Sequence, residues 1–133
     1  MKLTNLMAVK SIVCFVFGIP MLLAPVPLLI LFGITLDPGG RLIAQLLGAM
    51  VILLGTLLWL ARNADASDPA LRAIVFAVVV GDTIGFVVLL LGQLAGVTNA
   101  LGWINVAIWL FFALSFGYFQ FARPVAQTKT SIS

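Results

Sequence analysis

Apolar residues run almost without interruption over four stretches of the chain, and short polar segments separate the stretches. They cover residues 11–34, 41–61, 70–95 and 101–122. Each stretch has about 20 mostly apolar residues, the length that a helix needs to cross the hydrocarbon core of a bilayer. The pattern predicts an all-α integral membrane protein, an up-and-down four-helix bundle in a single domain over residues 1–123.

Proline and glycine mark the limits of these spans. Pro20, Pro25 and Pro27 fall inside the first stretch, so we expect its helix to be kinked, because each proline removes a backbone donor. Ser67 or Asp68 before Pro69 is typical of a helix N-cap followed by proline at the first helical position. The residues after the last span, 124–133, are predicted to be a polar, disordered tail.

Composition agrees with a membrane protein and argues against other classes. Hydrophobic residues make up 63% of the 133 positions and charged residues 8%, whereas a water-soluble domain has about 25% charged residues. The chain has no histidine and one cysteine, and it lacks paired carboxylates and metal-ligand spacings. The basic residues are scattered singly and form no patch. We therefore expect no enzyme activity, catalytic residue, metal, cofactor or nucleic-acid partner.

The basic residues predict the orientation. Six of the seven lie at one side of the predicted spans, and Arg41 alone lies at the other. The six are Lys2, Lys10, Arg62, Arg72, Arg123 and Lys129. Cytoplasmic loops are enriched in lysine and arginine, so both termini are predicted to be cytoplasmic, in a multi-pass protein of the cell inner membrane.

Asp82 is the main candidate for an intramembrane site. It lies ten residues after Arg72 in the third span, about 15 Å along a helix and so close to the midplane. A carboxyl there costs about 2.5–3.5 kcal/mol unless it is paired or protonated. No lysine or arginine is predicted at the same depth in the other spans. We expect a protonated carboxyl that donates to Ser115 or to a carbonyl freed by Pro20, either as a structural lock between helices or as a proton or cation relay.

Gln93 lies eleven residues after Asp82, which returns it to nearly the same helix face. It is predicted either to extend a polar lane from Asp82 or to pack and cap the end of the helix. Both interpretations are compatible with the sequence.

Glycines at helical spacing mark the second and third spans. Gly48 and Gly55 lie in the second span, and Gly81, Gly85 and Gly92 in the third. Pairs of small residues four positions apart let helix backbones approach closely. We expect a tight contact between these two spans, with a homo-oligomer interface as the alternative.

Arg41 and Gln45 lie one turn apart at the start of the second span. They are candidates for contact with an anionic head group or carboxylate on the outer face. The alternative is a snorkelling arginine that pairs with Asp37 across the turn.

The first two spans resemble small four-helix bacterial inner-membrane proteins of the DoxX-like kind and neighbouring families of unassigned function. The likeness covers residues 15–62: a proline-broken span that ends Leu-Phe-Gly at 31–33, and then Arg41, Gly48, Gly55 and Trp59. It implies a bacterial inner membrane and, for some relatives, association with quinone-linked redox partners.

Two classes of function follow from these features. The first is an accessory or structural subunit that packs against a larger membrane complex. The second is a small homo-oligomeric transporter or proton-coupled carrier that uses Asp82. The expected partners are the lipid bilayer and either another membrane protein or a second copy of the chain.

Overall fold

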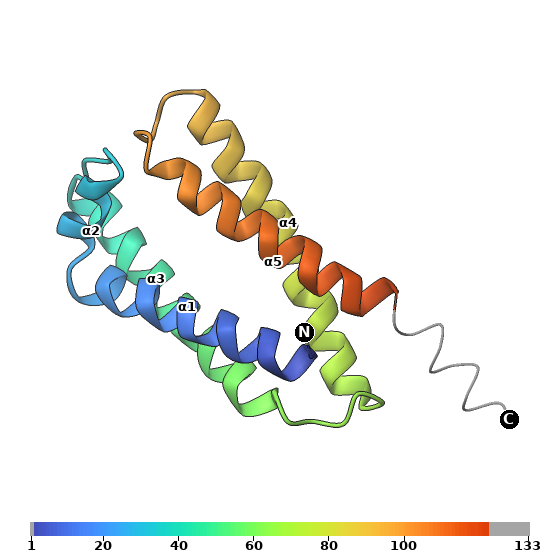
Figure 1. Cartoon of the computed structure of the whole chain (residues 1–133). Coiled ribbons are helices and arrows are strands. Elements are labelled where there is room, and N and C mark those ends of the chain that lie inside the picture. Colours follow the sequence, from blue (N-terminus) through green and yellow to red (C-terminus); the bar gives the residue numbers. More distant parts are fainter. Residues whose placement is uncertain (1, 123–133) are drawn as a thin grey trace, which may run out of the picture.

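The computed structural model describes residues 2–122, which form five helices and no strand. The helices are α1 (Leu3–Leu23), α2 (Pro25–Leu31), α3 (Pro38–Ala61), α4 (Pro69–Leu94) and α5 (Gly102–Phe121). Figure 1 shows α1 beside α3 and α4 beside α5. The three later spans begin and end within three residues of the limits predicted from the sequence.

Four of the helices are long and apolar enough to cross a membrane: α1, α3, α4 and α5. Large apolar side chains such as Leu60, Leu91 and Leu114 are exposed along them. A soluble monomer rarely leaves such extended apolar surface in water. The chain is therefore a small multi-pass membrane protein.

Helix α4 begins as its sequence predicts, and α3 begins at Pro38, three residues before the predicted limit at Arg41. The side chain of Asp37 accepts a hydrogen bond from the backbone N–H of Gly40, and Asp68 accepts one from Ala70. Each cap is followed by proline at the first helical position, where a missing N–H costs nothing. Of the two N-cap candidates before α4, the structure selects Asp68.

The first predicted span consists of two helices. α1 ends at Leu23, and α2 begins at Pro25 after the non-helical Ala24. Proline cannot donate the hydrogen bond that would continue α1. Close to this break, the carbonyl of Leu22 accepts a hydrogen bond from the side-chain amide of Gln45 over 3.1 Å. α1 also starts at Leu3, eight residues before the predicted limit at Ser11.

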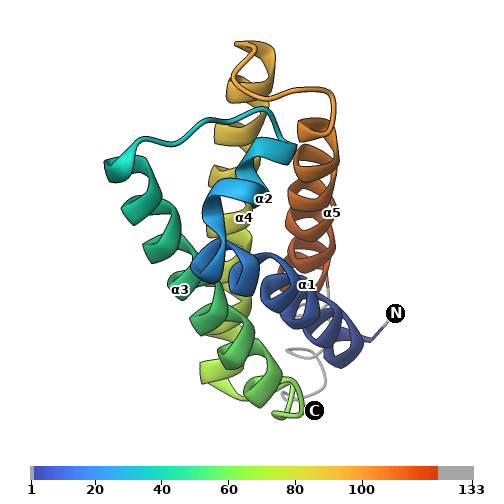
Figure 2. The ribbon, with the colours of Figure 1, turned by 90° about the vertical axis from the view of Figure 1, so that its left-hand side faces the viewer.

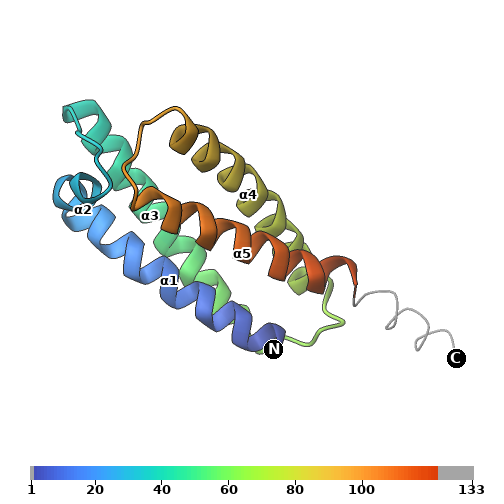
Figure 3. The same cartoon turned by 45° about the horizontal axis from the view of Figure 1, so that its top comes forward.

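Two helix pairs make up the fold. α1 packs along α3 and α4 packs along α5, while α5 also contacts α1 (Figure 3). α3 and α4 diverge from the loop that connects them, so they are not packed along their length (Figures 1 and 2). The predicted tight contact between the second and third spans is therefore wrong.

The glycines explain which helices approach. A Cβ on Gly48 would come within 2.8 Å of the backbone N of Leu22, and one on Gly55 within 2.9 Å of the Cβ of Cys14. These α3 glycines therefore serve the contact with α1. A Cβ on Gly85 would meet the ring of Trp109 in α5, whereas Gly81 and Gly92 have no such neighbour within 4 Å.

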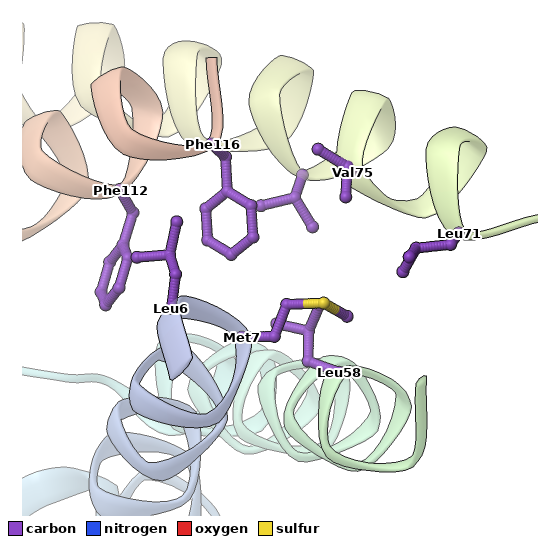
Figure 4. Close-up of a cluster of buried hydrophobic side chains, with 8 residues drawn as sticks. Leu6, Met7, Leu58, Leu71, Val75, Phe112 and Phe116 are labelled. Atoms are coloured by element: carbon purple, nitrogen blue, oxygen red, sulfur yellow. The ribbon is translucent and has the colours of Figure 1, made fainter. Parts of the chain in front are cut away.

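The two helix pairs meet at both ends of the molecule. Near the N-terminus, a cluster of buried apolar side chains joins α1, α3, α4 and α5 (Figure 4). Its members are Leu6, Met7, Leu58, Leu71, Val75, Val78, Phe112 and Phe116. At the other end, the side chain of Asn99 donates to the carbonyl of Leu31 over 2.8 Å, and its backbone N–H donates to Phe32.

Candidate functional site

A buried ion pair lies between the two helix pairs. The ammonium Nζ of Lys10 in α1 is 2.7 Å from the carboxylate Oδ1 of Asp82 in α4. Lys10 is 5% exposed and Asp82 2%, so bulk solvent does not screen the pair. It is the one salt bridge within residues 2–122. Because the two residues are 72 positions apart, the bond ties the first helix pair directly to the second.

The predicted surroundings of Asp82 are wrong: a protonated carboxyl without a cation at its depth was expected, and the structure places Lys10 beside it. Asp82 bonds to Lys10, and neither Ser115 nor a carbonyl near Pro20 is its partner. Ser115 is half-buried on α5. Lysine also has a long flexible stem, so its ammonium can lie far from its own Cα.

The error came from the assumed start of the first helix. A helix that started at Ser11 would leave Lys10 at the membrane surface. α1 begins at Leu3, so Lys10 is its eighth residue, about 10 Å along the helix axis. The apolar residues Leu3, Leu6 and Met7 were the signal that the helix extends further toward the N-terminus.

Two aromatic rings surround the ammonium group. Lys10 Nζ lies 4.4 Å from the ring centroid of Phe112 and 5.6 Å from that of Trp109, both on α5. The faces of aromatic rings attract cations, and the attraction is stronger where water is excluded. α5 therefore helps to hold a charge that α1 and α4 bring together.

One oxygen of the carboxylate lacks a partner. Asp82 Oδ2 is buried and accepts no hydrogen bond from any described residue. An ionised carboxylate can accept several hydrogen bonds, and a buried acceptor without a donor is destabilising by about 1–3 kcal/mol. The site thus has an unused acceptor at the end of the ion pair.

An apolar groove runs beside Asp82, whose side chain is buried at its wall. It has a volume of about 400 Å³ and lies between α3 and α4, with Trp109 of α5 at its inner wall. Leu54 and Leu57 line it from α3, and Ala77 and Gly81 line it from α4 beside Asp82. Leu57, Ala77 and Gly81 are exposed, so the groove opens on the outside of the protein between these two helices.

Ser11, the residue after Lys10, bonds to the other half of its own helix pair. Its buried hydroxyl donates to the carbonyl of Gly55 in α3 over 2.6 Å. The absence of a side chain at Gly55 brings the α3 backbone within reach of this hydroxyl. Lys10 and Ser11 therefore fix α1 to α4 and α3 respectively.

Gln93 belongs to a different cluster. Its Nε2 donates to the carbonyl of Asn99, and its Oε1 accepts from the hydroxyl of Thr98. Both partners lie in the connection between α4 and α5. Of the two interpretations, packing and capping at the helix end is the one observed, and no polar lane joins Gln93 to Asp82.

Arg41 and Gln45 do not act together. Gln45 donates to Leu22, as described above, and Arg41 is exposed at the start of α3. The carboxylate of Asp37 accepts from the backbone of Gly40 and forms no salt bridge with Arg41. Arg41 therefore remains free to contact a head group, whereas Gln45 has a structural role.

No group of three or more histidine, cysteine, aspartate or glutamate side chains lies together between residues 2 and 122. Cys14 is a buried free thiol in α1.

Comparison with protein-family models, with curated proteins and with solved structures finds no match to the chain. The resemblance to DoxX-like proteins therefore stays a prediction, and the fold and the Lys10–Asp82 site rest on the chain's own residues.

Proposed function

We propose that the protein is an accessory or structural subunit that packs against a larger complex in a bacterial inner membrane, with both of its termini in the cytoplasm. With Lys10 counted inside the membrane, five basic residues still lie on the predicted cytoplasmic side against Arg41 on the other. The asymmetry continues to favour this orientation.

The observation that supports this proposal is an exposed apolar side of α4, in the second half of the helix. A Cβ added to Gly92 would meet no atom within 4 Å, and the neighbouring Ile84 and Val88 are 60% and 63% exposed. These three residues fall on one side of the helix. A glycine flanked by exposed apolar side chains allows another transmembrane helix to approach closely.

The polar groups inside the membrane also favour a structural role. Lys10 is bonded to Asp82, Ser11 to α3, and Gln93 to the α4–α5 connection. Each of these bonds holds one part of the fold to another. The apolar outer surface is then the main surface that remains for an interaction.

Purification of the chain from its native membrane in mild detergent tests the proposal. We expect a partner to copurify in a fixed ratio, and Gly92→Leu to reduce its recovery because the added side chain keeps the helices apart. Gly117→Leu on α5 is the matched control, since Gly117 also has no neighbour within 4 Å. Recovery of the wild-type chain without a stoichiometric partner would contradict the proposal.

A second candidate is a proton-coupled carrier, and the unpartnered Oδ2 of Asp82 favours it. A buried carboxylate oxygen without a hydrogen-bond partner is an atom to which a proton can be transferred. In liposomes, Asp82→Asn should then abolish proton-coupled flux, because an amide cannot release a proton in this range. Undiminished flux in a folded Asp82→Asn variant would reject this role.

A further inference from the structure

The two ends of the molecule hold the helix pairs together in different ways. Within residues 2–122, buried apolar side chains form one cluster, and it joins the pairs at the end that carries the N-terminus. At the opposite end, called here the loop end, lie the connections 32–37 and 95–101. The link between the pairs at the loop end is a group of hydrogen bonds made by Asn99 (Figure 2).

Asn99 bonds to both helix pairs. Its Nδ2 donates to the carbonyl of Leu31 over 2.8 Å, and its backbone N–H donates to that of Phe32 over 2.9 Å. On its other side, Oδ1 accepts from the backbone N–H of Leu101, and its carbonyl accepts from Nε2 of Gln93. Asn99 therefore ties the end of α2, which belongs to the first pair, to α4 and α5.

Gly33 makes room for this contact. Its φ is +79°, a conformation that residues with a side chain rarely adopt. A Cβ on Gly33 would lie 3.3 Å from both the Cβ and the backbone N of Asn99, closer than ordinary van der Waals contact. The turn after α2 thus lies directly against Asn99, and the fit depends on the glycine.

The loop end is the weaker of the two. Burial of apolar side chains stabilises the N-terminal end, where the eight members of the cluster lie together. The bond from Asn99 to Leu31 is exposed, so water competes with it, and such a bond shifts the equilibrium by about fivefold. Regions with few buried apolar contacts and exposed hydrogen bonds open at the lowest free energy. The helix pairs should therefore separate first at the loop end.

The Lys10–Asp82 ion pair lies at the inner edge of the cluster. Leu6 and Met7 of the cluster precede Lys10 in α1. Val78 of the cluster precedes Asp82 by one turn in α4. The cluster therefore covers the ion pair on the side of the N-terminus, and separation of the helix pairs at the loop end would open a route to it from the other side.

From these observations we propose that Asn99 and segment 31–33 form a gate. When their hydrogen bonds break, the helix pairs separate at the loop end and expose Lys10 and Asp82 to the solution on that side, while the apolar cluster keeps the other end closed. The gate deepens the second candidate function and rests on it, because a carrier exposes its intramembrane site to one side at a time by moving one bundle against another.

Distances between two spin labels in lipid bilayers measure the opening directly. Thr35→Cys and Val97→Cys place labels on the two exposed loops of the loop end. Asn5→Cys and Phe121→Cys place labels on exposed positions of α1 and α5 at the N-terminal end. Cys14→Ala removes the native thiol from both label pairs and keeps its Cβ. We expect a second, longer distance at the loop end and a single distance at the N-terminal end.

The gate variants should act on the loop end alone. Asn99→Ala should raise the ratio of long to short distances about fivefold, and Gly33→Ala should raise it as well because its Cβ would push against Asn99. Thr98→Ala is the matched control, since it loses a bond to Gln93 within the second helix pair. A loop-end distribution that Asn99→Ala leaves unchanged, or that Thr98→Ala shifts as much, would overturn the proposal.

A membrane-impermeant thiol reagent tests the route to the ion pair. Lys10→Met with Asp82→Cys and Cys14→Ala puts a thiol at the site without a lone charge. Reagent applied on the side of the loops should react about fivefold faster when Asn99→Ala is added. Reaction from the N-terminal side alone, or a rate that Asn99→Ala does not change, would contradict the gate. Opening without proton-coupled flux in liposomes would support the gate and reject the carrier.

Discussion

Removing one member of the Lys10–Asp82 pair should destabilise the protein far more than removing both. Lys10→Met leaves the Asp82 carboxylate without a counter-charge, and Asp82→Leu leaves the Lys10 ammonium in the same position. Both residues are at most 5% exposed, so solvent cannot compensate for the lost partner. Loss of one partner from a buried pair costs about 3–5 kcal/mol.

The double variant Lys10→Met/Asp82→Leu replaces both charges by apolar side chains. Such replacements are often neutral or stabilising, because the desolvation cost of the two charges disappears with their attraction. The two single losses would sum to about 6–10 kcal/mol if they were independent. With a double variant close to the wild type in stability, the coupling energy between the two positions is about 6 kcal/mol or more.

Unfolding in mixed micelles with increasing sodium dodecyl sulfate, followed by circular dichroism, measures the four free energies of the cycle. Asp82→Asn adds a discriminating variant. A protonated carboxyl acting only as a donor would be replaced by asparagine with little loss, whereas the ion pair predicts clear destabilisation. Single variants as stable as the wild type, or a double variant as unstable as the sum of the singles, would refute the ion pair.

Three further predictions concern the helix contacts and the topology. Gly48→Ala should destabilise the protein by about 1–3 kcal/mol, because its Cβ would meet the backbone of α1, whereas Gly92→Ala should not. Thermal unfolding in detergent compares the two variants, and equal melting temperatures would contradict the packing of α1 against α3. Asn99→Ala removes the side-chain hydrogen bonds to the carbonyl of Leu31 and to the backbone N–H of Leu101. Amide hydrogen exchange in segments 29–34 and 97–102 should therefore accelerate, and unchanged exchange would show that these bonds do not hold the loops. Reporter fusions after Arg62 and Arg123 should report cytoplasm and those at Gly39 and Asn99 the outer side, and one reversal would contradict the proposed orientation.

The later helices were predictable because their limits depend on local chemistry. Asp37 and Asp68 cap α3 and α4 through their own neighbouring backbone, and each is followed by proline, so the sequence contains the whole signal. The predicted start of α4 differs from the observed one by a single residue.

The start of α1 was harder to predict because a lysine interrupts its apolar pattern. A lysine close to the N-terminus of an apolar run normally marks the membrane surface. Lys10 was therefore not predicted as the partner of Asp82. Its burial depends on a carboxylate 72 residues away, which no local pattern reports.

The glycine contacts were predicted in type but assigned to the wrong helix. Small residues indicate that a helix has a close neighbour, but they do not identify the neighbour. Gly48 and Gly55 contact α1, and Gly85 contacts Trp109 of α5. The groove between α3 and α4 exists because these glycines bring each helix close to a different partner.

Solid-state NMR of the protein in lipid bilayers tests the central claim most directly, with ¹⁵N on the lysine side chains and ¹³C on the aspartate carboxyls. Dipolar coupling between the two labels reports Nζ–Cγ distances below about 4 Å, which a hydrogen-bonded ion pair requires. Within the described residues, Lys10 and Asp82 form the one such pair. We expect a single strong coupling that Lys10→Met abolishes. A wild-type spectrum without this coupling would contradict the account.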